Sequence, residues 1–385
     1  MASLCITGAL RTTPSADLNV LLHLLPLDII SKQSAATTAV RLRELSEWSG
    51  NDCGYSKTLS MMPEVAGITD YALSESLFDK KYYTLIPDRD AWRDCIPGGR
   101  KCIDFYTDGS KSDYRVGFGV YSKDLGLSIA RRLPDHCSVY QAEMMAIKEV
   151  AEWLRHNILT KIGINIFSDS QAAIKSLESI FLNSKTALSC RKSLNEMAEQ
   201  FKIHLIWVPG HRDIPGNCKA DELARLGTTL QIPGSLESVG MPLASCKLIL
   251  RNRSIETTNQ RWARLGKCEH SRNIWPKLDP KRSQDLLSLS KQNVSLIVSV
   301  VTGHCLIGRH AERLNVATSD LCRTCGDEEE EVSIKHLLCT CPRLWKERLN
   351  TLGSCSFMEL ADLEDVAIGR LLAFLRQSKW FGERN

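Results

Sequence analysis

The fold of the central part of this chain is decided by the stretch Ile103-Asp-Phe-Tyr-Thr-Asp-Gly-Ser110. Apolar and polar residues alternate over its first part, and an acidic turn then ends the run, as at the end of a β-strand. Two further strands are predicted at residues 116–121 and 127–133, joined by turns rich in Gly, Asp and Ser. Apolar residues at helical spacing then predict a helix over 138–156.

The rest of this segment continues to alternate between strands and helices. Strands are predicted at 162–167 and 204–208, and helices at the stretch that begins with Asp169, at 187–201 and at 219–226. The order is therefore three strands, helix, strand, two helices, strand, helix. This pattern predicts an α/β domain with a five-stranded sheet that helices flank.

The sequence before and after this domain differs from it in periodicity, charge and cysteine content. Together with the domain itself, this predicts four segments. Residues 1–98 carry leucines at helical spacing and predict a mostly helical segment, and 99–229 form the α/β domain. Residues 230–300 predict a basic helical linker, because the stretch 240–320 contains 13 basic and 6 acidic residues, a net of +7. Residues 301–385 form a small C-terminal region rich in Cys and His.

The composition is that of a globular protein, since 43% of the 385 residues are hydrophobic and 24% are charged. The net charge of +4 is too small to identify a partner. No apolar run approaches the ~18 residues of a membrane span, and the first residues lack the pattern of a signal peptide. We therefore expect an intracellular protein, in the nucleus or the cytoplasm, with no membrane partner and with its 15 cysteines mostly reduced.

Four acidic residues of the α/β segment occupy positions that suit a metal site. Asp108 and Asp169 each follow a strand, where ligand sites of α/β folds commonly lie. Glu143 lies on the first predicted helix and Asp221 opens the last one. A single Asp after a strand is usually a turn former, but four carboxylates that converge would repel one another unless cations lay between them. Carboxylate oxygens favour Mg²⁺ or Mn²⁺.

The stretch 101–229 resembles type 1 ribonuclease H. The motifs that carry the resemblance occur in the family's order: Tyr106-Thr-Asp-Gly-Ser110, Gln141-Ala-Glu143, Ser168-Asp-Ser170, Trp207-Val-Pro-Gly-His211, Pro215-Gly-Asn217 and Ala220-Asp221. The resemblance implies a ribonuclease H-like mixed five-stranded sheet and an endonuclease that hydrolyses the RNA strand of RNA/DNA hybrids. The short distance from Asp169 to His211 implies the variety that lacks an extra basic helix for binding substrate.

The resemblance also implies roles for single residues. Two Mg²⁺ ions, or Mn²⁺, would lie ~4 Å apart and perform the hydrolysis, and His211 would move protons or assist product release. The implied catalytic and metal-binding residues are Asp108, Glu143, Asp169 and Asp221, with His211 as a further catalytic residue. The implied substrate contacts, which select RNA through its 2′-hydroxyls, are Gly109, Ser110, Gln141 and Asn217. The chain departs from the family at Cys218, where Glu is common.

A second group of metal-ligand types lies near the C-terminus. Cys322 and Cys325 form a pair with two residues between them, and the following Gly allows the backbone to turn around a metal. His336 follows at close spacing, and either Cys339 or Cys341 could complete a Cys₃His site. Three thiolates and one imidazole favour a structural Zn²⁺.

This region resembles the C-terminal zinc-binding part of non-LTR retrotransposon polyproteins. The resemblance rests on Thr302-Gly-His304, on Arg309-His310, on the Cys322–Gly326 pair and on His336 to Pro342, and its spacing selects Cys341 as the fourth ligand. Residues 8–14 and 24–27 resemble the segment after the polymerase core of the same elements, while the aromatic-x-Asp-Asp polymerase motif is absent. The sequence thus predicts a retroelement-derived ribonuclease H; the alternative is an inactive nucleic-acid-binding remnant.

Overall fold

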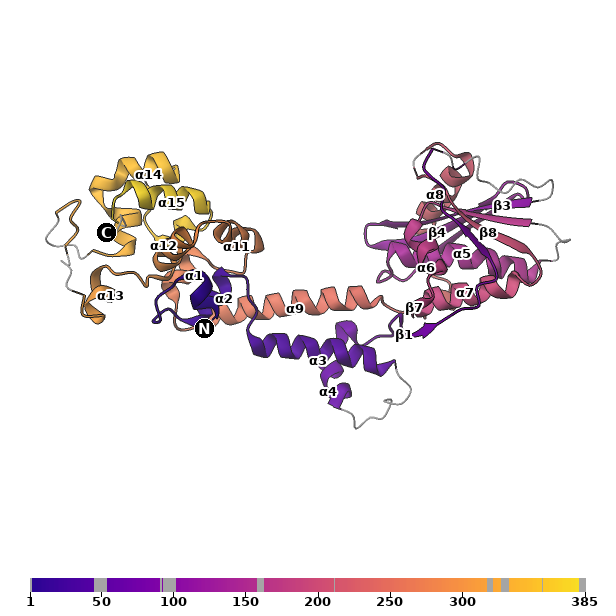
Figure 1. Ribbon diagram of the computed structural model, residues 1–385, viewed down its shortest axis with the longest axis horizontal. Helices are drawn as coiled ribbons and strands as arrows, with labels where there is room; N and C mark the ends of the chain where they lie inside the picture. Colours follow the sequence, from indigo (N-terminus) through magenta and orange to yellow (C-terminus); the bar gives the residue numbers. More distant parts are fainter. Residues whose placement is uncertain are drawn as a thin grey trace. The chain divides into compact units, whose positions relative to one another are not determined.

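The computed structural model describes most of the chain, which Figure 1 draws as ribbons. The described residues are 2–44, 54–90, 92, 102–157, 163–210, 212–316, 321–326, 332–354 and 356–380. They form two compact units. The sheet unit is Ala35–Leu250, and the terminal unit joins Met1–Ser34 to Arg251–Asn385. The predicted segments 1–98 and 230–300 are therefore each divided between the two units.

A six-stranded mixed sheet forms the centre of the sheet unit, with the strand order β2-β8-β6-β3-β4-β5. The strands β3, β4 and β5 are antiparallel neighbours, whereas β3, β6, β8 and β2 pair in parallel. The bounds are β2 (Tyr83–Leu85), β3 (Cys102–Ser112), β4 (Arg115–Ser122), β5 (Leu127–Leu133), β6 (Gly163–Ser168) and β8 (Lys202–Trp207).

The five predicted strands and the mixed α/β architecture are confirmed. The sheet contains one more strand than the sequence predicted, because β2 pairs with β8 at the far edge. The strand β2 has only three residues, which is too few for an alternating pattern to be visible in the sequence.

Alternation along β4 places helices on both faces of the sheet. Val116, Phe118 and Val120 are fully buried in the core that α5 also lines. Gly119 faces the other way, and a Cβ atom there would lie only 2.4 Å from the backbone oxygen of Ala220 in α8. Glycine thus allows α8 to lie directly on the sheet. The helices are α5 (Val139–His156), α6 (Gln171–Glu178), α7 (Lys185–Met197) and α8 (Pro215–Gly227).

Smaller elements extend the sheet unit. The strands β1 (Tyr71–Ser76) and β7 (Phe181–Ser184) form a separate antiparallel pair. Ala36, Val40, Leu59 and Leu250 belong to a small helical core. Its elements are α4 (Gly54–Ser60), η2 (Pro63–Val65), the part of α3 (Leu27–Arg43) from Ala35 on and the part of α9 (Leu243–Arg264) up to Leu250, and η3 (Gly234–Leu236) lies between α8 and α9.

The terminal unit is helical, and residues from both ends of the chain share its core. Leu18 and Leu21 of α2 belong to one buried cluster with Trp275 and Phe374. The helices are α1 (Ala2–Thr7), α2 (Ser15–Leu21), α10 (Glu269–Ile274), α11 (Pro280–Leu287), α12 (Lys291–Thr302), α13 (Gly308–Arg313), α14 (Trp345–Leu352) and α15 (Ile368–Gln377), with short turns η4 (His336–Thr340), η5 (Pro342–Leu344) and η6 (Leu360–Leu363). Within the described residues, no helix combines the length and the apolar character that crossing a membrane requires.

Candidate active site

Strand register brings Asp108 and Asp169 to the same edge of the sheet. In the parallel pair β3 and β6, Thr107 lies opposite Ser168. Asp108 and Asp169 are the next residues along their chains, so the two carboxylates leave neighbouring strands at the same level. The indole Nε1 of Trp207 donates a hydrogen bond to the backbone oxygen of Asp169 at 3.0 Å, which fixes the turn after β6.

Glu143 comes from the first turns of α5, which lie against β3. Ser138 caps this helix, since its hydroxyl accepts from the backbone N–H of Gln141 and its own N–H donates to the Gln141 side chain. The backbones of β3 and α5 approach so closely that a Cβ atom on Gly109 would lie 2.7 Å from the Glu143 nitrogen. Only glycine fits there, and its N–H donates to the Glu143 carboxylate.

Three of the four predicted acids meet. Asp108, Glu143 and Asp169 each offer a carboxylate oxygen, and these oxygens all lie within 4.8 Å of one another. The side chains of Asp108 and Glu143 are buried, in residues that are only 7% and 5% exposed. Such a group of buried oxygens has the ligand type and spacing that a hard divalent cation needs.

Electrostatics support the same assignment. Burial, followed by the charges of Asp169 and Asp221, raises the pKa of Asp108 to about 8. Burial, together with the charges of Asp108 and Asp169, raises the pKa of Glu143 well above its usual value. The carboxylates therefore disfavour one another's ionised forms despite the positive charge of Arg225, and a bound cation would relieve this repulsion.

Asp221 lies on α8 outside that group of three. Its carboxylate forms an ion pair with Arg225 at 2.7 Å, one helical turn away. Its negative charge still contributes to the raised pKa of Asp108. The sequence reasoning placed Asp221 at the site but missed Arg225, although the spacing of four residues on a helix is a detectable signal.

The predicted substrate contacts occupy different environments. Ser110 is half-buried in β3, one residue after Gly109. Asn217 is buried, and its Nδ2 lies 3.5 Å from Oδ2 of Asp169, so it touches a candidate metal ligand. Gln141 is fully buried, and its Nε2 donates to the backbone oxygen of Gly240 at 2.9 Å. That geometry does not favour the predicted contact between Gln141 and substrate.

The predicted catalytic histidine, His211, lies outside the described residues. The residue before it, Gly210, lies beside the site, because a Cβ atom there would be 2.8 Å from Oδ2 of Asp169. Gly210 therefore lies next to the carboxylate group.

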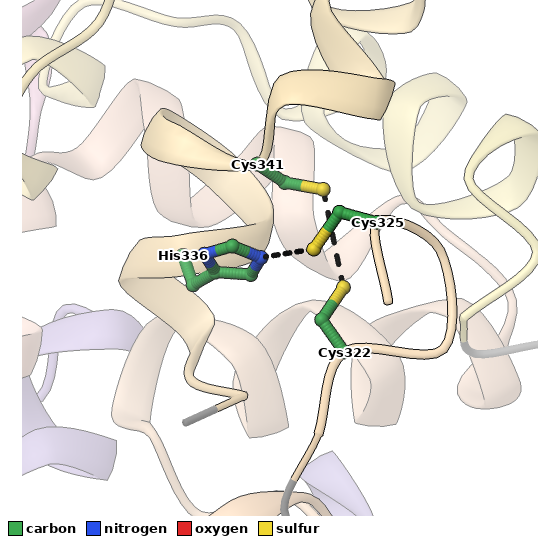
Figure 2. A group of neighbouring side chains, drawn as sticks. All are labelled: Cys322, Cys325, His336 and Cys341. Carbon is green, nitrogen blue, oxygen red and sulfur yellow. Dashed lines mark hydrogen bonds between the residues drawn. The ribbon is translucent and has the colours of Figure 1, made fainter. Parts of the chain in front are cut away.

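The cysteine and histidine side chains of the terminal unit also converge. Figure 2 shows Cys322, Cys325, His336 and Cys341 pointing toward one another, and their ligand atoms all lie within 4.8 Å. Sγ of Cys325 lies 3.5 Å from Nε2 of His336, and Sγ of Cys322 lies 3.9 Å from Sγ of Cys341.

Cys341 joins this group and Cys339 does not, because η4 is a π-helical turn. The N–H of Cys341 donates to the oxygen of His336 at 2.7 Å, five residues back. Cys339 is buried as well, but its sulfur is not among the four converging ligand atoms, and burial raises the pKa of its thiol to about 11. Although burial opposes it, hydrogen bonds from the N–H groups of Cys325 and Thr324 lower the pKa of Cys322 to about 7, which favours the thiolate that zinc binds.

One comparison with known proteins bears on this geometry. Residues 100–229 match the family model described as RNase H. The match covers the strands β3 to β8 and the helices α5 to α8, which carry all the carboxylates described above. The chain therefore contains an RNase H domain at residues 100–229.

Proposed function

We propose that the sheet unit hydrolyses the RNA strand of RNA/DNA hybrids. The observation that carries the proposal is the group formed by Asp108, Glu143 and Asp169, two of which are buried carboxylates with raised pKa values. Carboxylates held in this arrangement bind metal ions rather than stabilise a fold, because their mutual repulsion costs free energy until a cation binds.

The four carboxylates, including Asp221, would hold two divalent cations, which in such sites supply an activated water and stabilise the leaving 3′ oxygen. The protein's own groups keep the ligands in place. The N–H of Gly109 and the Ser168 hydroxyl, 3.5 Å away, orient the Glu143 carboxylate. Asn217 and the hydrogen bond from Trp207 orient Asp169.

Gly109 and Ser110 are the proposed contacts to the 2′-hydroxyls of the RNA strand, because they continue β3 directly past Asp108. His211 is proposed to move protons at the site, since the residue before it, Gly210, lies beside Asp169. Asn217 serves the metal ligand rather than the substrate in this proposal.

We also propose that Cys322, Cys325, His336 and Cys341 bind one structural Zn²⁺ in the terminal unit. The donor set of three sulfurs and one imidazole suits zinc, and no position remains open for chemistry. Together with the sequence resemblance, this site supports an origin in a non-LTR retroelement.

The test is a cleavage assay with Mg²⁺ on labelled RNA/DNA hybrid, RNA duplex and DNA duplex. We expect the full chain to cut only the RNA strand of the hybrid, and Asp169→Asn to be inactive while it still binds the hybrid. Glu222→Gln is the matched control, because Glu222 lies beside Asp221 on α8 but pairs with Lys219 in solvent. Binding of hybrid by the unaltered chain without any cleavage would favour the inactive remnant instead.

A further inference from the structure

A cavity of about 670 Å³ opens in the terminal unit, separate from the carboxylate and cysteine groups. One wall is α12, and the others are residues 8–10, residues 304–307 and Trp380. This volume lies within the range of ~300–1,000 Å³ that is typical of small-ligand sites.

One stripe of the α12 wall is polar. Lys291, Ser295 and Ser299 succeed one another at intervals of four residues, so all three face the cavity. The Ser295 hydroxyl donates to the backbone oxygen of Gly8 at 2.9 Å, which holds the N-terminal wall against α12. Lys291 is exposed and forms no ion pair with any residue of the described chain.

The rest of the lining is largely apolar. Leu306 and Ile307, together with Leu296 on α12 itself, contribute aliphatic surface. Cys305 is buried, and burial raises the pKa of its thiol to about 12, so it remains neutral. None of the described lining residues is acidic. A lysine without an acidic partner, next to both a polar stripe and an apolar surface, favours a ligand that combines an anionic group with an apolar one.

Trp380 supplies an aromatic wall, and the two residues between Cys322 and Cys325 hold its ring in position. Its Nε1 donates to the Thr324 hydroxyl at 2.7 Å. The Arg323 guanidinium lies 4.4 Å from its ring centroid and donates to its backbone oxygen at 3.1 Å. Arg323 and Thr324 are the two residues between Cys322 and Cys325. The indole is therefore preorganised before any ligand arrives.

We propose that this cavity binds one nucleotide of a single nucleic-acid strand. The base packs against Trp380 and the aliphatic wall, and the phosphate is neutralised by Lys291. Aromatic surface combined with a cation is the pattern by which proteins hold single strands without reading their sequence. Two further observations favour this ligand: the stretch 240–320 carries a net charge of +7, and the same chain contains an RNase H domain.

The test measures fluorescence anisotropy of the full chain with labelled 20-nucleotide single strands of RNA, of DNA and of an abasic backbone. We expect Lys291→Gln to weaken binding of the first two about fivefold and to reduce the slope of log affinity against log salt by ~0.7, the value for one phosphate contact. Ser299→Phe places a ring in the cavity and keeps every cation. It should abolish the preference for strands with bases over the abasic strand, a preference of about tenfold for one stacked base.

The controls use an equivalent pair outside the cavity. Lys346 lies over Trp345, 5.6 Å from its ring centroid, and neither residue lines the cavity. Equal weakening by Lys346→Gln and Lys291→Gln would overturn the proposal, as would a Ser299→Phe protein that still prefers bases. Trp380→Leu should lose the same preference for strands with bases. Its zinc content shows whether the four-residue metal group is still intact. Single strands are not substrates of the proposed hydrolysis, so Asp169→Asn should bind them as the unaltered chain does. The hydrolysis and the binding of single strands can therefore fail independently of each other.

Discussion

The side-chain amide of Gln141 connects the start of α5 to Gly240, donating through Nε2 to the Gly240 oxygen at 2.9 Å while its Oε1 accepts from the Ser138 N–H at 3.1 Å. The segment around Gly240 is held on its other side as well, because a Cβ atom on Gly240 would lie 2.4 Å from the backbone carbon of Thr69. The hydrogen bond from Gln141 therefore joins the chain after the RNase H domain to the start of the helix that carries Glu143, and the contact with Thr69 limits where that chain can move.

This relationship predicts that Gln141 positions Glu143 rather than contacts the substrate. Gln141→Glu keeps the acceptor for Ser138 but sets a carboxylate against the Gly240 oxygen. We expect kcat to fall about tenfold, since misplacement of about 1 Å at a catalytic site can cost up to ~100-fold, with little change in the KM for hybrid. Steady-state kinetics at saturating Mg²⁺ measure both.

A second variant separates the two roles of Gln141. Gly240→Ala forces the segment away from Thr69 without touching α5, and should reproduce the loss of kcat. If Gln141→Glu instead raised KM and left kcat unchanged, Gln141 would be a substrate contact, as the sequence alone suggested.

The raised pKa of Asp108 predicts how pH acts on the protein without Mg²⁺. A carboxyl group whose pKa is about 8 when folded, against 3.8 ordinarily, binds its proton more tightly in the folded chain. It therefore stabilises the fold at low pH, and this stability is lost as pH rises from about 4 to about 8. We expect amide hydrogen exchange in β3 and β6 to accelerate over that interval beyond the intrinsic pH effect.

Asp108→Asn serves as the control for this pH effect, since it cannot ionise. Its exchange should show no such acceleration, and added Mg²⁺ should suppress the acceleration in the unaltered protein by binding the folded state. Equal acceleration in Asp108→Asn would contradict the assignment to this carboxyl group.

The ion pair between Asp221 and Arg225 predicts a competition between an arginine and the metal. Both side chains are partly exposed, 35% and 65%, so the pair contributes at most ~1 kcal/mol. Arg225→Gln should lower the Mg²⁺ concentration for half-maximal cleavage by about two- to fivefold at pH 9, where Asp108 is ionised. Lys219→Gln, which removes a cation paired with Glu222 on the same helix, should leave it unchanged. A higher Mg²⁺ requirement in Arg225→Gln would mean that Arg225 assists metal binding.

The zinc proposal predicts opposite results for two neighbouring cysteines. Cys341→Ser removes a sulfur of the four-residue group and should lower zinc from one ion per chain toward none. Cys339→Ser leaves the group intact and should retain zinc, although a hydroxyl in the core destabilises the terminal unit. Elemental analysis of the purified proteins distinguishes them. If Cys341→Ser kept its zinc while Cys339→Ser lost it, Cys339 rather than Cys341 would be the ligand.

The parts of the structure that the sequence predicted are those that local periodicity encodes. The strand at Ile103 and the helix that carries Glu143 each display their period over enough residues to be recognised. The strands β2 and β7 have only three and four residues. The pairing of β1 with β7 and of β2 with β8 depends on partners far away in the chain. The sequence likewise placed Asp108 and Asp169 together, although it expected both to follow strands: Asp169 follows β6, whereas β3 continues past Asp108 to Ser112.

Long-range packing determined what the sequence could not show. The amide of Gln141 is occupied by Gly240, 99 residues later, and no local pattern reveals that contact. Cys339 and Cys341 both follow His336 closely, and only the π-helical turn decides between them. The division of residues 1–98 between two units follows from the burial of Leu18 and Leu21 beside Trp275, which is equally invisible to periodicity.

The shared core of the terminal unit has a consequence for synthesis of the protein. Leu18 and Leu21 leave the ribosome before any of Arg251–Asn385 exists, and all of Ala35–Leu250 is made in between. The nuclease fold can therefore be complete while the leucines of α2 still lack the partners that bury them. Although α2 is made early, it can pack into its core only after its partners in the terminal unit have been made.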